Sequence, residues 1–313
     1  MSEGRVLVTG AAGLIGNAVC ALLAARGRRV VAVDRAPAPG CPEGLAAVDV
    51  TDVHGLYAAV GDLPLDGVVH CGAYSGPMVA RDTPHDMFRV NVAGTANVLE
   101  LARVRGARRF VFCSSTSAYG PTGPGPVTED RPLVSGTLYG ASKAAGEALV
   151  RGYARQFAPD GASLRLCWVY GPRRTTDCII RTMITDAQAG RPTRVPFGRG
   201  FPRQFIHVED AARALVTALD APGPLGGQAF NVTGGAFLTL DQVAAAAREV
   251  LPEADIELAE GPDPVDDLQQ RFDTSAVERV LGFRPGIPLD QGIRSYAAWL
   301  ASGAQAAIQG RQP

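Results

Sequence analysis

Thr9-Gly10-Ala11-Ala12-Gly13-Leu14-Ile15-Gly16 is the stretch that decides the fold of this chain. It follows the apolar run Arg5-Val6-Leu7-Val8, which is typical of a buried strand, and it opens into a helical pattern over residues 17–25. The first turn of such a helix presents free N–H groups and a partial positive charge, both of which suit a pyrophosphate. Gly10 permits a tight turn, Gly13 lets the backbone approach the phosphates, and Gly16 lets the helix pack closely on the strand. The stretch predicts a dinucleotide-binding unit.

A second apolar strand, Arg29-Val30-Val31-Ala32-Val33, ends in Asp34, and this acid strengthens the prediction. A glycine pattern alone is weak evidence in a chain with 37 glycines, whereas an acid at this distance can bind the adenine ribose 2′-hydroxyl. A carboxylate repels a 2′-phosphate, so Asp34 favours NAD over NADP as the cofactor. Arg35 is the competing feature, because its guanidinium can host that phosphate.

Tyr139 and Lys143 are four residues apart, which puts them on one face of a helix. A free tyrosine has a pKa of about 10 and is a poor base near neutrality. A neighbouring ammonium stabilises the phenolate, so that the phenol can exchange a proton with a substrate oxygen while hydride moves at carbon. Ser115, at the end of the apolar strand 109–113, can hydrogen-bond the same oxygen. These residues predict hydride transfer at a secondary alcohol or ketone.

Ordered motifs along nearly the whole chain resemble those of extended short-chain dehydrogenases/reductases, which include sugar-nucleotide epimerases and dehydratases. After the glycine stretch come Asp49-Val50-Thr51-Asp52, His70-Cys71-Gly72-Ala73, Asn91-Val92-Ala93-Gly94-Thr95, residues 114–120, Tyr139 to Lys143, Val169-Tyr170-Gly171-Pro172, residues 203–210 and Leu281-Gly282-Phe283-Arg284-Pro285. Alignment on Tyr119-Gly120 places the catalytic serine at Ser115. The resemblance implies an NAD-dependent enzyme with Ser115, Tyr139 and Lys143 as its catalytic residues.

The resemblance also implies which residues contact the cofactor and the substrate. For NAD they are Gly10, Gly13, Leu14, Ile15, Gly16, Asp34, Arg35, Asp49, Val50, Cys71, Gly72, Ala73, Asn91, Tyr139, Lys143 and Val169. For a sugar-type substrate they are Ser75, Ser115, Thr116, Trp168, Arg203 and Arg271.

The substrate class remains open between two alternatives. Arg203 and Arg271 match the arginines that hold a nucleotide diphosphate in epimerases of this family, and paired guanidinium groups suit phosphate well. Arg271 can equally pair with Asp273 or Asp267 at the surface. Trp168 replaces the family's asparagine, and its indole either narrows the substrate pocket or packs under the nicotinamide.

Dehydratase chemistry is disfavoured, because Thr116-Ser117 stands where those relatives have an Asp-Glu pair that protonates the leaving hydroxyl. A sugar-nucleotide epimerase is therefore the first hypothesis. An NAD-dependent dehydrogenase of a free sugar or sugar acid is the alternative, and a non-catalytic NAD(P)-sensing protein is a remote one.

Composition indicates a cytoplasmic enzyme without a nucleic-acid or membrane partner. Basic residues number 30 and acidic residues 31, so no basic surface for nucleic acid or anionic lipid is indicated. We expect no signal peptide or transmembrane run, and six scattered cysteines fit a reducing compartment. The four histidines lack metal-ligand spacing, so no metal is expected.

Alternating strand and helix patterns predict an α/β protein with a Rossmann-type doubly wound parallel sheet and a smaller C-terminal substrate-binding region. Strands are expected near 5–9, 29–33, 46–48, 67–71, 109–114, 162–168 and 229–232, and helices near 86–105, 138–157 and 208–219. Residues 1–172 plus 203–233 are predicted to form the NAD-binding domain, and residues 173–202 plus 234–313 the substrate-binding region.

A homodimer through the helices near 86–105 and 138–157 is expected, mainly by resemblance to the family. Both helices carry apolar or small residues beyond what one core face needs: Val98, Leu99, Leu101 and Ala102 on the first, and Ala144, Ala145 and Ala148 on the second.

Overall fold

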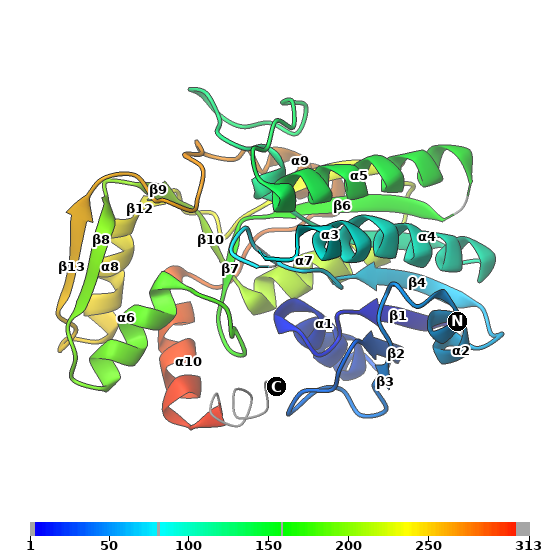
Figure 1. Cartoon of the computed structure of the whole chain (residues 1–313), viewed down its shortest axis with the longest axis horizontal. Coiled ribbons are helices and arrows are strands. Elements are labelled where there is room, and N and C mark those ends of the chain that lie inside the picture. The colour runs from blue at the N-terminus through cyan, green and yellow to red at the C-terminus, as the bar shows by residue number, and fades with distance from the viewer. Residues whose placement is uncertain (1–3, 80–81, 158, 305–313) are drawn as a thin grey trace.

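A seven-stranded parallel sheet forms the centre of the larger lobe in the computed structural model, which describes residues 4–79, 82–157 and 159–304. The strand order is β11-β6-β5-β4-β1-β2-β3. The order reverses between β1 and β4, and ligands bind at such a switch point, beyond the carboxyl ends of the strands. The predicted Rossmann-type fold is confirmed (Figure 1).

The strands of the sheet begin and end close to the predicted positions. Their bounds are Arg5–Thr9 (β1), Arg29–Asp34 (β2), Ala46–Ala47 (β3), Leu65–His70 (β4), Arg109–Ser115 (β5), Asp160–Leu166 (β6) and Gln228–Val232 (β11). The sequence prediction of one strand over 162–168 is wrong at its end. The chain leaves the sheet at Cys167, and Trp168–Tyr170 (β7) pairs instead with Phe205–His207 (β10).

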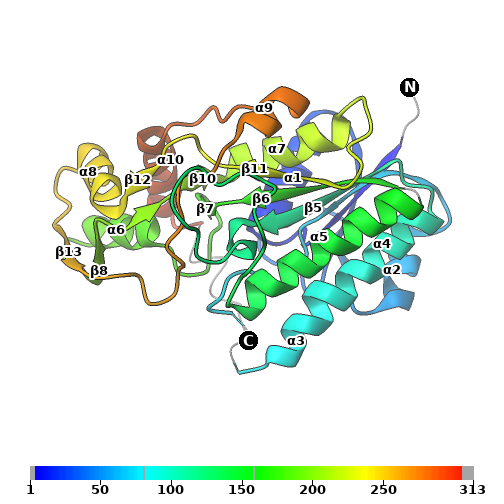
Figure 2. The same cartoon turned by 90° about the horizontal axis from the view of Figure 1, so that it is seen from above.

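Helices cover both faces of the sheet (Figure 2). Val6 and Val8 of β1 face Leu14–Ala25 (α1) and Val208–Asp220 (α7), whereas Leu7 faces the opposite core. That second core is closed by Val53–Val60 (α2), Gly94–Val104 (α4) and Leu138–Gln156 (α5). Both faces of β1 are buried, which explains its uninterrupted apolar sequence.

The helix expected over 86–105 is divided into three segments. It consists of Pro84–Phe88 (α3), a π-helical segment Arg89–Ala93 (η1) and α4. Segments of this type interrupt α-helices mostly at functional sites. Here the π-helical turn carries the buried Asn91.

The smaller lobe has its own apolar core. It contains Ile179–Gln188 (α6), Thr193–Arg199 (β8), Pro202–Arg203 (β9), Leu238–Thr239 (β12), Leu240–Val250 (α8), Ile256–Glu260 (β13) and Leu289–Ala301 (α10). Ser275–Leu281 (α9) lies apart from it, because Val277 packs in the core of the sheet lobe. The domain boundary at residue 234 stays a prediction, and residues 305–313 of that region lie outside the described residues.

Candidate active site

A cavity of about 470 Å³ lies beyond the carboxyl ends of the strands. Its lining combines the glycine stretch, the ends of β2, β4 and β5, the start of α5 and the segment after β6. It therefore brings together Asp34, Ser115, Tyr139 and Lys143, which are far apart in the sequence.

Most of the residues predicted to contact the cofactor line this cavity. They are Gly10, Gly13, Leu14, Ile15, Gly16, Asp34, Arg35, Asp49, Val50, Cys71, Gly72, Ala73, Tyr139, Lys143 and Val169. Ser75, Ser115, Thr116 and Trp168 of the predicted substrate residues line it as well. Their roles stay predictions, but their placement in one cavity is what those roles require.

The glycine turn is shaped for close approach. Gly10 has a φ of +68°, and a Cβ there would lie 2.7 Å from the backbone of Cys71. A Cβ on Gly16 would lie 2.1 Å from the carbonyl oxygen of Gly10. Larger residues would displace the start of α1 from the turn. The N-cap of α1, Gly13, makes no side-chain cap, so the first N–H groups of the helix remain for a pyrophosphate. The site fits a dinucleotide.

Asp34 stands at the end of the cavity that would hold the adenine ribose. One carboxylate oxygen accepts from the backbone N–H of Ala12 at 2.9 Å, and the other accepts from that of Arg35 at 2.7 Å. Burial raises the pKa of Asp34, and these backbone donors lower it in part. The Arg35 side chain turns to Tyr74, whose ring centre lies 5.5 Å from the guanidinium carbon.

Lys143 and Tyr139 extend from the first turns of α5 toward the end of β5. The Lys143 ammonium donates to the carbonyl of Cys113 at 2.8 Å and lies 5.8 Å from the centre of the Tyr139 ring. Both side chains are at least nine-tenths buried. Ser115 caps a short 3₁₀ turn and accepts from the backbone N–H of Ser117 at 3.1 Å. The ammonium is therefore fixed by β5 beside the phenol.

A buried ion pair stabilises the arrangement of Ser115, Tyr139 and Lys143. Glu147, one turn beyond Lys143 on α5, pairs with Arg165 of β6 at 2.6 Å. It also accepts from the Ser114 hydroxyl at 2.6 Å. Because Ser114 directly precedes Ser115, this network fixes the end of β5 against α5.

His70 is fully buried, and each of its ring nitrogens lies close to a threonine hydroxyl. Its Nδ1 lies 2.6 Å from the Thr9 hydroxyl and its Nε2 lies 3.0 Å from the Thr95 hydroxyl. Burial, with a smaller contribution from Lys143, lowers the pKa of His70 to about 3. Among the described residues, no group of His, Cys, Asp and Glu side chains is arranged to hold a metal ion.

Asn91, predicted to contact the cofactor, does not line the cavity. Its amide group accepts from the backbone N–H of Tyr74 at 2.8 Å and donates to the Tyr74 carbonyl at 3.0 Å. It also donates to the Ser142 hydroxyl at 2.9 Å. Asn91 thus joins the cavity-lining segment around Tyr74 to α5, and any effect on the cofactor is indirect.

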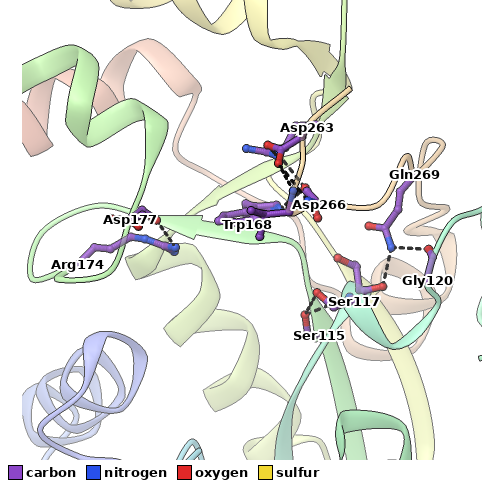
Figure 3. Close-up of polar contacts among 12 residues, drawn as sticks. Ser115, Ser117, Gly120, Trp168, Arg174, Asp177, Asp263, Asp266 and Gln269 are labelled. Atoms are coloured by element: carbon purple, nitrogen blue, oxygen red, sulfur yellow. Dashed lines mark hydrogen bonds and ion pairs between the residues drawn. The ribbon is translucent and has the colours of Figure 1, made fainter. Parts of the chain in front are cut away.

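Trp168, which lines the cavity, forms a compact cluster with Arg203, Asp263 and Asp266. Figure 3 shows Trp168 beside the two aspartates. The indole N–H donates to Asp266 at 2.7 Å, and the Arg203 Nε donates to the same carboxylate oxygen at 3.0 Å. Arg203 also pairs with Asp263, and its guanidinium carbon lies 4.5 Å from the indole centre. The predicted anion-binding arginine is therefore already neutralised by two buried carboxylates.

Arg271 is not brought to this site. A second, small pocket lies beside Arg203 and is lined among others by Thr116, Trp168 and Gln269. The side chain of Arg271 is exposed and lines neither this pocket nor the cavity. Its carbonyl instead accepts from the backbone N–H of Val127. The expected Arg203–Arg271 pair is absent from the described structure, because in the segment before α9 Gln269 lines the small pocket with Arg203, whereas Arg271 is exposed to solvent.

The sequence analysis did not single out Arg174, which lines the cavity, or Asp266 and Gln269, which line the small pocket that shares Thr116 and Trp168 with it. The Gln269 amide donates to the carbonyls of Thr116 and Gly120, each at 2.9 Å, and so holds the loop after Ser115 (Figure 3). No sequence pattern distinguishes Gln269 or Asp266 from their polar neighbours. Arg174 had a signal, since two arginines directly follow Gly171-Pro172.

Comparisons with known proteins agree with this geometry. Residues 6–233 match the sequence profile described as the NAD dependent epimerase/dehydratase family. The chain is 32% identical to UDP-glucose 4-epimerase of Mycolicibacterium smegmatis, over 92% of this chain and 96% of the relative. It is 31% identical to dTDP-glucose 4,6-dehydratase of Streptomyces griseus, over 94% of this chain and 93% of that relative. The solved structure of a UDP-glucose 4-epimerase of Thermus thermophilus, in complex with NAD, is 29% identical in sequence and superposes with a TM-score of 0.83. The match covers 95% of this chain and 99% of that protein.

Proposed function

The chain belongs to the NAD-dependent epimerase/dehydratase family, and we propose that it interconverts two epimers of a sugar nucleotide. It is an NAD-dependent enzyme of the extended short-chain dehydrogenase/reductase type. The observation that carries the proposal is the cavity in which the glycine turn and Asp34 lie together with Ser115, Tyr139 and Lys143. The relatives UDP-glucose 4-epimerase and dTDP-glucose 4,6-dehydratase, both named for sugar-nucleotide substrates, support a sugar nucleotide as the substrate.

In this proposal each catalytic residue has one task. NAD, when bound, supplies an acceptor and donor of hydride. Tyr139 accepts the proton of the reacting hydroxyl, and Lys143 stabilises the phenolate that makes this possible. The Ser115 hydroxyl donates a hydrogen bond to the same substrate oxygen and fixes its position. Epimerisation then requires the ketone to turn within the cavity before Tyr139 returns the proton.

The lining of the cavity argues against a dehydratase. Its acidic residues, within the described part of the chain, are Asp34 and Asp49, both at the adenine end. Thr116 and Ser117 line the substrate end, and neither hydroxyl is acidic enough to protonate a leaving group near neutral pH. Epimerisation needs no such acid.

One observation favours a second candidate, an NAD-dependent dehydrogenase of a free sugar or sugar acid. The positive charge of Arg203 is neutralised by Asp263 and Asp266, and Arg271 lies outside the cavity. Neither arginine is therefore available, in this arrangement, for a diphosphate. A free sugar or sugar acid does not need them.

The two candidates differ in a direct experiment. An epimerase should interconvert UDP-glucose and UDP-galactose without added NAD and without net NADH, and UDP should inhibit it competitively. A dehydrogenase should reduce added NAD with a sugar or sugar acid and be indifferent to UDP. Chromatographic separation of the sugar nucleotides and absorbance of NADH measure both reactions. Net NADH with no epimerised product would contradict the proposal.

Location in the cytoplasm and assembly as a homodimer are further parts of the proposal. Within residues 4–79, 82–157 and 159–304, no helix has the length and hydropathy to cross a membrane. Val98, Leu99, Leu101 and Ala102, which were expected to support the dimer, are buried in the protein's own core. Support comes instead from Phe88, the last residue of α3, and Phe157, directly after α5, which are both about half exposed. Light scattering at micromolar concentration tests it, and a monomer would contradict it.

A further inference from the structure

Arg174 is a buried cation that forms no ion pair within residues 4–79, 82–157 and 159–304. Its side chain is about 91% buried, since 9% of its surface is exposed, and it lines the cavity near Trp168. Its guanidinium donates to the backbone carbonyls of Val169 and Asp177, the latter at 2.9 Å. Its Nε–H is buried and has no hydrogen-bond partner in the part of the chain that the structure describes. Among the described acidic side chains, none forms an ion pair with Arg174.

Trp168 contacts two arginines whose surroundings differ. The indole centre lies 4.5 Å from the guanidinium carbon of Arg203 and 5.4 Å from that of Arg174. Arg203 is paired with Asp263 and Asp266, whereas the contacts of the Arg174 guanidinium with other described residues are to neutral carbonyls and the indole ring. Burying a charge without a counter-ion is costly. The contrast indicates that the counter-ion of Arg174 arrives with a ligand.

The other cations of the cavity cannot serve the substrate end in the same way. Arg35 lies at the adenine end against Tyr74, and Lys143 is held beside Tyr139 by the carbonyl of Cys113. The glycine turn and the N-terminus of α1 would hold the NAD pyrophosphate through backbone N–H groups. Arg174 is therefore the described lining cation at the substrate end that has no other task.

We propose that Arg174 binds a carboxylate on the sugar, so that the enzyme acts on an acidic sugar rather than a neutral one. A guanidinium matches a carboxylate with parallel N–H donors, and charge-assisted bonds of this kind are about twice as strong as neutral ones. This inference rests on the proposed function of the same cavity. The carboxylate belongs either to the sugar of a sugar nucleotide or to a free sugar acid, and the experiment below distinguishes the two.

The experiment compares acidic with neutral ligands on the protein with NADH bound, where no turnover occurs. Isothermal titration calorimetry measures the affinities of UDP-glucuronic acid and UDP-glucose, and of D-glucuronate and D-glucose. In the wild type, at least one acidic ligand should bind roughly tenfold to a hundredfold more tightly than its neutral counterpart. In Arg174→Met, which keeps much of the side-chain volume, this ratio should fall to about one. Arg174→Lys should retain part of it, because the charge remains.

Two controls give each result a meaning. Arg181→Met removes donors to the carbonyls of Arg174 and Thr175 without removing the Arg174 charge, so the ratio should persist. NADH affinity should stay unchanged in Arg174→Met. Equal affinities for acidic and neutral ligands in the wild type would overturn the inference. So would loss of the ratio in Arg181→Met, or a fall in NADH affinity in Arg174→Met with the ratio intact, which would assign the charge to a cofactor phosphate.

The outcomes also separate this inference from the proposed function. Preference for D-glucuronate with no binding of UDP-glucuronic acid would support the role of Arg174 and contradict a sugar-nucleotide substrate. Equal binding of UDP-glucose and UDP-glucuronic acid would support a sugar-nucleotide substrate and contradict the role of Arg174.

Discussion

Replacing Asp34 by alanine tests the cofactor assignment quantitatively. The carboxylate already accepts from the backbone N–H groups of Ala12 and Arg35, at 2.9 and 2.7 Å. A carboxylate has about four acceptor positions, so roughly two remain for the hydroxyls of the adenine ribose. A hydrogen bond to a charged group contributes about 1.5–3 kcal/mol, and 1.4 kcal/mol corresponds to a factor of ten. Asp34→Ala should therefore weaken NAD binding about tenfold to 150-fold.

The same change should improve the relative use of NADP. The charge that repels a 2′-phosphate is gone, while Arg35 remains on the exposed side of the site. Fluorescence titration with NADH and NADPH gives both dissociation constants for each protein. Asp62→Ala is a matched control, because it removes a fully exposed carboxylate that does not line the cavity. It should leave both constants unchanged.

The protonation of Asp34 adds a dependence on pH. Burial raises its pKa, and the donors from Ala12 and Arg35 reduce that rise. The charged form binds the ribose, so NAD affinity in the wild type should fall as the pH falls through this raised pKa. Asp34→Ala should lack that dependence. A wild type that prefers NADP, or an unchanged ratio of the two cofactors in Asp34→Ala, would refute the assignment.

Three further predictions follow from other residues. Tyr139→Phe removes the transferable proton, so it should lower turnover by about 10² or more with little change in NAD binding. Lys143→Met should impair both turnover and NAD binding. Near-normal turnover of Tyr139→Phe would contradict the role of Tyr139. His70 has a folded pKa of about 3, below its ordinary 6.5, so the unfolded state binds more protons between these values. The stability that neutral His70 contributes is fully present above about pH 6.5 and is lost as the pH falls below it. Between pH 7.5 and 5, the unfolding free energy measured with urea should therefore fall more steeply for the wild type than for His70→Gln. Identical slopes would be the contrary result. Glu147→Ala leaves Arg165 buried without its partner and should cost about 3–5 kcal/mol of unfolding free energy, whereas a simultaneous Arg165→Met should recover part of it; no recovery would indicate that the pair is not the cause.

Local features of the chain were predictable because backbone geometry and helical periodicity act over a few residues. The glycine turn requires a positive φ at Gly10 and close contact at Gly16, and only glycine meets both conditions without strain. Tyr139 and Lys143 share a face because they are one helical turn apart. The parallel sheet followed from alternation of apolar strands with helices. These signals were enough for the fold class, the family and the cofactor.

The bend at Cys167 shows where local patterns stop being informative. Residues 162–168 are apolar enough to read as one strand, but β6 ends at Leu166 and β7 pairs with β10 outside the main sheet. The choice depends on which strand lies alongside, and that partner comes from a distant part of the chain. The bend matters to function because it turns Trp168 toward the smaller lobe.

The sequence by itself therefore determined the cofactor half of this protein, and the tertiary structure decided the substrate half. The indole of Trp168 meets Asp266 across 98 positions of sequence, and Arg203 meets the same carboxylate across 63. No periodicity relates residues so far apart, because their contact depends on how the smaller lobe packs against the sheet. That packing pairs Arg203 with Asp263 and Asp266, leaves Arg271 in solvent and buries Arg174 without a counter-ion among the described side chains. Which of several arginines keeps a positive charge available for a ligand is therefore decided by the positions of the side chains in the tertiary structure.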